Sequence, residues 1–203
     1  MKNYRVRGHT NFEVMAMCGR YTLFEEDEIR EILRAVNQQG QEVKTGEIYP
    51  TNPAPVLTLK NDQVLPEAQI WGFPGFGTRK GVIINARSET ADQKPMFRGS
   101  LETGRCVVPS TGFYEWTKDK DKVKYKFNLP GSKILYMAGL WKEFAGERRY
   151  VILTTAANTS VSDIHDRMPV VLLPDQLDAW VRDKDKVLNI LTGDHPMLEK
   201  TAV

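Results

Sequence analysis

The sequence predicts a single α+β domain built around a mostly antiparallel, barrel-like β-sheet with a few flanking helices. Short segments rich in β-branched and aromatic residues dominate the chain between residues 56 and 155. Strands do not alternate with helices, which disfavours a doubly wound parallel sheet. The chain has 203 residues, of which 41% are hydrophobic and 27% charged. This length and composition are sufficient for one domain with a sizeable hydrophobic core.

The first expected element is a helix from Phe24 to Asn37. Ile29, Leu33 and Val36 recur at helical spacing, and the acidic residues of its first turn suit the positive end of a helix dipole. The next segment, residues 40–55, contains several glycines and prolines. It is expected to form an ordered but irregular loop.

Strands are expected over most of the remaining chain. Two of them flank a turn at Asn61-Asp62 and form a hairpin, and the charged residues 118–122 are typical of a solvated hairpin tip. Helices are expected over Pro174–Val181, where proline suits the first helical position, and over Asp185–Leu191. The expected strands are Val56–Lys60, Val64–Ile70, Gly81–Ala86, Arg105–Pro109, Tyr125–Leu129, Ile134–Trp141, Arg149–Thr155 and Val170–Leu173.

Composition narrows the possible classes of protein. The net charge of +2 neither requires nor excludes a nucleic-acid partner. No apolar run reaches transmembrane length, so we expect a cytoplasmic monomer without membrane association, near the nucleoid if bacterial. The two cysteines and three histidines lack the spacing of a zinc site, and neither a metal nor another cofactor is expected. Cys106, inside an apolar strand, is expected to be a small buried hydrophobe.

The most informative residue is Cys18, which follows Met17. If the mature chain begins at Cys18, that residue carries a free α-amine and a thiol on adjacent carbons. This pair condenses with an aldehyde to an imine and closes to a thiazolidine, which an amide nitrogen cannot do. We therefore expect a functional domain over residues 18–203, preceded by residues 1–17 as an early start, a leader or a propeptide, with the early start first.

Four polar clusters interrupt the hydrophobic framework. Each is expected at or just after the end of a strand, where a rigid sheet can bring polar groups together. Singly, each cluster is more typical of a strand cap, a surface residue or a turn than of a site. The four are Cys18-Gly19-Arg20-Tyr21, Asn85-Ala86-Arg87-Ser88-Glu89, Gly112-Phe113-Tyr114-Glu115-Trp116 and His165-Asp166-Arg167-Met168-Pro169.

Together, in this order, these motifs resemble those of the SRAP (SOS response-associated peptidase) family. The resemblance covers most of the chain, from Cys18 to about Leu173, and includes MCGRY, NARSE, CVVP..GFYEW, and LTTAAN followed by HDRMPV. It also includes Asn52–Pro55 and Trp71-Gly72. The extension before Met17 departs from the family pattern, in which the cysteine directly follows the initiator methionine.

The resemblance implies covalent capture of abasic sites in single-stranded DNA, which shields the lesion from strand cleavage. Cys18 would be the nucleophile through both its amine and its sulfur. Glu115 would shuttle protons during imine formation, and His165 would protonate the sugar ring oxygen during ring opening. Asn85 would orient the amine or a sugar hydroxyl.

Contacts with DNA are expected from arginines and tryptophans within the motifs. Arg20, Arg87 and Arg167 suit phosphate oxygens, although one of them could pair with Glu115 or Asp166 instead. Trp71 and Trp116 are candidates for stacking on bases. Packing in the core is the alternative, and for Trp71 the two roles carry equal weight.

Three other functions compete with covalent capture. The first is a thiol autopeptidase that removes its own residues 1–17. The second is a non-covalent single-stranded DNA-binding protein in which the extension permanently blocks the amine of Cys18. The third and weakest is a generic cysteine hydrolase, which would need only the thiol.

Overall fold

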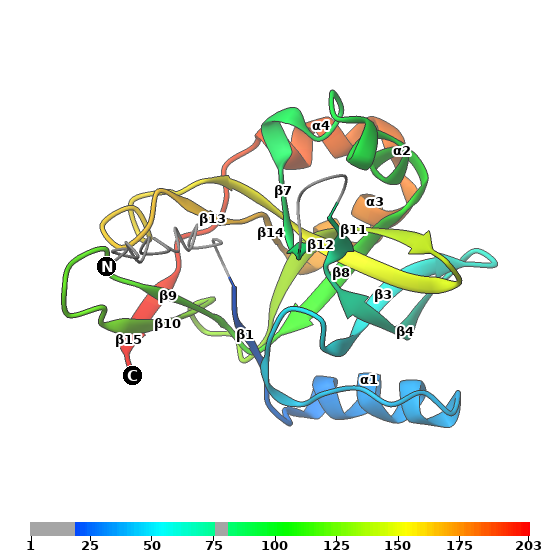
Figure 1. Cartoon of the computed structure of the whole chain (residues 1–203), viewed down its shortest axis with the longest axis horizontal. Coiled ribbons are helices and arrows are strands. Elements are labelled where there is room, and N and C mark those ends of the chain that lie inside the picture. The colour runs from blue at the N-terminus through cyan, green and yellow to red at the C-terminus, as the bar shows by residue number, and fades with distance from the viewer. Residues whose placement is uncertain (1–18, 76–80) are drawn as a thin grey trace, which may run out of the picture.

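The computed structural model describes residues 19–75 and 81–203 and confirms an α+β fold with mostly antiparallel sheets (Figure 1). The α-helices are α1 (Asp27–Gln38), α2 (Pro95–Thr103), α3 (Leu177–Arg182) and α4 (Lys184–Thr192). Single 3₁₀ turns cover Ser88–Thr90 and Pro174–Gln176. The strands are β1 (Tyr21–Leu23), β2 (Gly46–Ile48), β3 (Pro53–Lys60), β4 (Gln63–Trp71), β5 (Phe73–Pro74), β6 (Val82–Ile83), β7 (Asn85–Arg87), β8 (Arg105–Ser110), β9 (Phe113–Trp116), β10 (Lys124–Asn128), β11 (Leu135–Phe144), β12 (Glu147–Ala156), β13 (Arg167–Pro169), β14 (Val171–Leu172) and β15 (Glu199–Ala202).

Five strands close into a barrel. They pair in the order β4, β3, β8, β11 and β12, and β12 returns to pair with β4. Every pairing is antiparallel except β12 with β4. The short strands β7 and β13 pair with the last residues of β12, so they extend the barrel at one end. Closure removes the free edges that an open sheet of these strands would expose.

A second, open sheet lies beside the barrel in the order β15, β10, β9, β1 and β2 (Figure 1). Helix α1 lies at one end of the molecule, and α2, α3 and α4 gather at the other. The core has two parts. One part contains Tyr21, Trp71 and Tyr150. In the other part, Val107 and Leu153 of the barrel belong to one cluster with Trp180 of α3 and with apolar residues of α4.

The proline-rich segment before residue 56 is more regular than expected. Residues 46–48 form β2, and β3 begins at Pro53. The carbonyl of Pro53 accepts a hydrogen bond from Lys44 at 2.8 Å, so this residue faces away from β4. Pro55, two residues on, faces the same way. Proline has no N–H to donate, but at these two positions the N–H would not have pointed to β4. The β3–β4 ladder therefore loses no hydrogen bond at the prolines.

Helix α1 begins at Asp27, three residues after the expected start, because Glu26 is still extended at φ −96° and ψ 163°. Helix α2 was not expected. The helices expected near residues 174 and 185 are present, the first with a 3₁₀ turn at its start. The polar clusters do not all follow strand ends as expected, because residues 85–87 and 113–116 are themselves strands. Along the described residues, no helix is long and apolar enough to cross a bilayer.

Candidate functional site

The candidate site is assembled from four segments that are far apart in the sequence. Cys18 lies outside the described residues, and Gly19 is the first described residue of its cluster. Strand β1 pairs with β9 through Tyr21 and Phe113. The main-chain N–H of Tyr114 then donates to the carbonyl of Arg20 at 3.0 Å. The first and third polar clusters therefore lie side by side.

The start of β9 depends on a glycine. Gly112 has φ +130°, a conformation that favours glycine. A Cβ atom there would lie 2.7 Å from the carbonyl oxygen of Phe127 on the neighbouring strand β10. Gly112 thus lets the chain turn sharply against β10 and enter β9 in register with it.

Glu115 lies on β9 opposite Tyr125 of β10 and is only 4% exposed. A surface position was the less specific alternative for a glutamate between two aromatic residues, and the structure does not support it. A carboxylate this far from water requires compensating interactions. Such groups concentrate at functional sites.

The end of β9 leads to the histidine cluster. Lys118, two residues after Trp116, has its Nζ 3.6 Å from Oδ1 of Asp166. Both side chains are largely exposed, so this ion pair joins the two loops weakly. It nevertheless places the loop after β9 next to the loop that carries His165.

His165 is mostly buried and lies between β12 and β13. Its Nδ1 is 3.1 Å from the main-chain nitrogen of Arg167 and 3.0 Å from Oδ1 of Asp166. The first neighbour is a donor and the second is an acceptor. They therefore suit different proton states of Nδ1, because a ring nitrogen either accepts or donates.

Arg167 joins the histidine cluster to the Asn85 cluster. Its guanidinium binds both carboxylate oxygens of Glu89 and donates to the carbonyl oxygen of Thr154 at 2.6 Å. The hydrogen bond from Arg167 holds the pKa of the Glu89 carboxyl below its usual value. From the sequence, pairing with Glu115 or Asp166 was the alternative to phosphate contact for one of the arginines. In the structure, Arg167 pairs with Glu89.

Asn85 and Arg87 lie on β7, which runs parallel to β12. Asn85 pairs with Ile152, and Arg87 pairs with Thr154. The Asn85 side chain is partly buried, while Arg87 is exposed. Of the three arginines expected to meet phosphate, Arg87 is therefore the most accessible.

Trp71 is fully buried, so the expectation that it stacks on DNA bases is wrong for this structure and the alternative of core packing holds. Its ring lies edge-on to Tyr21 at 5.2 Å and parallel to Tyr150 at 6.5 Å. Its indole N–H donates to the carbonyl of Ile84 at 3.1 Å. Trp71 thus supports the residue directly before Asn85.

An aromatic–basic surface lies on the second sheet and consists of Arg20, Tyr49, Trp116 and Lys124. The Arg20 guanidinium lies 4.7 Å from the centre of the Tyr49 ring and 5.0 Å from that of Trp116. Lys124 is opposite Trp116 in the β9–β10 ladder. Arg20 and Trp116 were expected from the motifs. Tyr49 was missed because it lies in the segment expected to be an irregular loop, and Lys124 because it lies just before an expected strand.

Glu47 lies within this surface and reduces its positive charge. It accepts a hydrogen bond from Lys124 at 2.7 Å and lies 3.9 Å from Arg20. The bond from Lys124, followed by that from the Tyr49 hydroxyl, lowers the pKa of the Glu47 carboxyl. With Glu47 ionised, the surface has a net charge of about +1, so aromatic stacking would contribute more than bulk charge.

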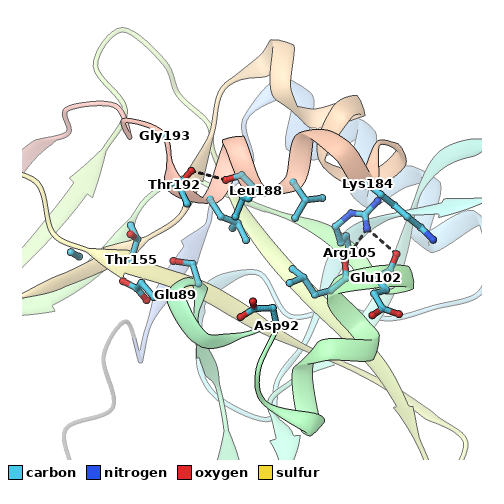
Figure 2. A pocket seen from close by; sticks show the side chains of 14 residues that line it. Glu89, Asp92, Glu102, Arg105, Thr155, Lys184, Leu188, Thr192 and Gly193 are labelled. Atoms are coloured by element: carbon cyan, nitrogen blue, oxygen red, sulfur yellow. Dashed lines mark hydrogen bonds between the residues drawn. The ribbon is translucent and has the colours of Figure 1, made fainter.

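A cavity borders the Asn85 cluster through Ser88 and Glu89, and a buried cysteine lies inside the barrel. A cavity of about 560 Å³ opens between α2 and α4, with Leu101 and Leu188 on its walls and Glu89 at its edge (Figure 2). Neither Glu115 nor His165 lines it. Cys106 is a free thiol inside the barrel with no exposed surface, as expected, and burial raises its pKa.

Comparisons with known proteins find similar sequences and a similar fold. The family model described as SOS response associated peptidase (SRAP) matches residues 17–201. The abasic site processing protein YoqW of Bacillus subtilis is 36% identical over 187 residues, which cover 83% of this chain and 82% of that protein. The abasic site processing protein YedK of Escherichia coli is 28% identical over 180 residues, covering 83% and 81%. A crystal structure of a protein from Bordetella bronchiseptica superposes with a TM-score of 0.74 at 26% identity, over 92% of this chain and 99% of that one.

Proposed function

The chain belongs to the SOS response associated peptidase family, and we propose on that basis that it processes abasic sites in single-stranded DNA by covalent capture through Cys18. Relatives that match most of its length are named abasic site processing proteins. The thiazolidine mechanism is our specific proposal for this chain. It requires that residues 1–17 are absent, so that Cys18 has a free α-amine.

The proposed reaction joins Cys18 to C1′ of the abasic sugar. The closed sugar first opens: the bond between C1′ and the ring oxygen breaks, the ring oxygen gains a proton, and the hydroxyl on C1′ loses one to give the aldehyde. The amine then attacks C1′, and water leaves to form an imine. Finally sulfur adds to C1′ and the thiol proton moves to nitrogen. An α-amine has an ordinary pKa of about 7.7–8.0, so a useful fraction is uncharged near neutral pH.

The observation that carries this proposal is the pairing of β1 with β9. The Arg20 carbonyl accepts a hydrogen bond from the Tyr114 N–H, and the same register continued by one residue would set Gly19 opposite Glu115. Cys18 is joined to Gly19 by one peptide bond, and consecutive Cα atoms are about 3.8 Å apart. Chain connectivity therefore supports a role for the buried carboxylate of Glu115 close to Cys18.

The remaining polar residues have distinct proposed roles. Glu115 moves protons during imine formation, His165 protonates the sugar ring oxygen, and Asn85 orients the amine or a sugar hydroxyl. Arg87 would contact phosphate, and Arg20 with Trp116 would hold the strand beside the lesion. Arg167 keeps a lesser role in DNA contact, since Glu89 already occupies its guanidinium.

The test compares chains that begin at Cys18 with the full-length chain on single-stranded DNA carrying one abasic site. We expect a covalent species on denaturing gels with the Cys18-initiated chain, and none with Cys18→Ser. A tetrahydrofuran analogue of the abasic site, which has no aldehyde, is the matched DNA control. Equal crosslinking by a full-length chain whose residues 1–17 are confirmed by mass would refute the mechanism, and binding without crosslinking would favour the non-covalent alternative.

Self-cleavage is the second candidate, because the matching family model is described as a peptidase. In that case Cys18 would promote an N-to-S acyl shift and hydrolysis would release residues 1–17. Intact-mass measurement of the full-length chain and of Cys18→Ala distinguishes the two functions. Identical retention of the segment in both chains would eliminate self-cleavage.

A further inference from the structure

The neighbours of His165 suggest how its proton is controlled, an inference that rests on the proposed function. Nδ1 has the main-chain N–H of Arg167 at 3.1 Å and Oδ1 of Asp166 at 3.0 Å. The N–H requires an unprotonated Nδ1 with the ring proton on Nε2. The carboxylate requires a protonated Nδ1.

The donor in this pair is held in place by its surroundings. Arg167 pairs with Ala156 in the β12–β13 ladder, and its side chain is clamped by Glu89 and the Thr154 carbonyl. The carbonyl of Asp166 also accepts from Ala157 at 3.0 Å. The main-chain N–H of Arg167 is therefore a fixed partner for the His165 ring.

The acceptor, the Asp166 carboxylate, is less tightly held than the Arg167 N–H, and its negative charge is partly neutralised by Lys118. The Asp166 side chain is 72% exposed and lies 3.6 Å from Lys118 on the β9–β10 loop. Desolvation raises the pKa of its carboxyl, but its own main-chain N–H and the charges of His165 and Lys118 outweigh this, and the pKa is lowered. Asp166 is thus a carboxylate that attracts a proton on Nδ1, while Lys118 competes for it.

We propose that Asp166 is a positioning residue that accepts the Nδ1 proton of His165 when the ring is charged, while the Arg167 N–H keeps the neutral ring protonated on Nε2. The charged ring gives its Nε2 proton to the sugar ring oxygen. The neutral ring that remains carries its proton on Nδ1, where Asp166 still accepts it. Loss of that proton to water and reprotonation of Nε2 restore the resting tautomer, so atoms and charges balance.

This arrangement links two loops of the site. Among the described residues, Asp166 contacts the ring from its own loop, Lys118 of the β9–β10 loop contacts Asp166, and the Arg167 guanidinium is turned to Glu89. Lys118 follows the strand of Glu115, so it links the loop after that strand to the carboxylate that contacts His165.

The experiment measures imidazole ¹⁵N and ¹H shifts in the full chain labelled with ¹⁵N-histidine, over a pH series and without DNA. In the unmodified chain the neutral His165 ring is expected to carry its proton on Nε2. Asp166→Asn should keep that tautomer and lower the titration midpoint of His165 by about half a pH unit, the scale of an exposed ion pair. Lys118→Met should move the midpoint upward.

Asp163→Asn is the matched control, because Asp163 lies in the same loop but pairs with Lys200. It should leave the His165 midpoint in place. In the Cys18-initiated chain, Asp166→Asn should slow crosslinking about twofold at the midpoint, about threefold well above it and little at lower pH. A neutral ring protonated on Nδ1, or an unchanged midpoint in Asp166→Asn, overturns the proposal. Absence of crosslinking in the unmodified Cys18-initiated chain would instead refute the proposed function and leave the spectroscopic result intact.

Discussion

The indole N–H of Trp71 and the main-chain N–H of Ile152 donate to the same carbonyl, that of Ile84, at 3.1 and 3.0 Å. This shared acceptor ties the barrel strands β4 and β12 to the residue before Asn85. A tryptophan that the sequence offered as a base-stacking candidate thus supports the site from inside the core.

Replacing Trp71 with phenylalanine is expected to lower stability and leave DNA contact unchanged. The change removes one hydrogen bond and some buried volume, while Ile152 still satisfies the Ile84 carbonyl. We expect a loss of about 1–2 kcal/mol in the free energy of unfolding, measured in urea. A large loss of affinity for single-stranded DNA at unchanged stability would contradict the core assignment.

Trp116→Ala, in contrast to the Trp71 variant, is expected to weaken DNA binding rather than to lower stability. Trp116 lies on the aromatic–basic surface next to Arg20, and loss of one stacked base costs about 1–3 kcal/mol of binding. Fluorescence anisotropy with the tetrahydrofuran analogue measures this without the covalent step. Trp141→Ala is the matched control, since Trp141 lies on β11 of the barrel beneath Arg148. Equal affinities for the two variants would exclude a stacking role for Trp116.

Glu115→Gln is expected to slow covalent capture while preserving affinity for the DNA analogue. The amide keeps the shape of the side chain but cannot move protons, and a group in that role contributes about 10²–10⁴-fold to a rate. Single-turnover crosslinking with the Cys18-initiated chain measures the effect. An unchanged rate would remove Glu115 from the proposed chemistry.

Glu89→Gln tests the ion pair that joins two of the clusters. The Glu89 side chain is 46% exposed, so we expect a modest loss of about 0.5–1 kcal/mol at neutral pH. Because its pKa is lower in the folded chain, its stabilisation is complete above the usual carboxyl value of about 4.3 and is lost as the pH falls through the lowered value. Urea unfolding at pH 7 and pH 3 should show the difference between the two chains shrinking at acid pH.

The two cysteines should react differently with a thiol reagent. Burial raises the pKa of Cys106 and keeps reagents away from it. We expect Cys106 to react only after unfolding, and Cys106→Ala to crosslink DNA at the unmodified rate. Fast labelling of Cys106 in the native chain, located by peptide mass, would contradict its burial.

Local patterns predicted a large part of this fold. Alternation and β-branched residues located most of the barrel strands, and helical spacing located α1, with a start three residues too early. The short strands β1, β13 and β15 were missed because they have at most four residues, too few to show a period. Their pairing depends on neighbours at least eleven positions away.

The sequence by itself determined the fold class, the family motifs and the chemistry available to them, because these depend on residue type and spacing. Tertiary structure alone decided that Arg167 binds Glu89, that Trp71 is buried and that Tyr49 and Lys124 join Arg20 on one surface. These outcomes follow from strand register and burial. Both arise from packing between distant segments, which no local pattern records.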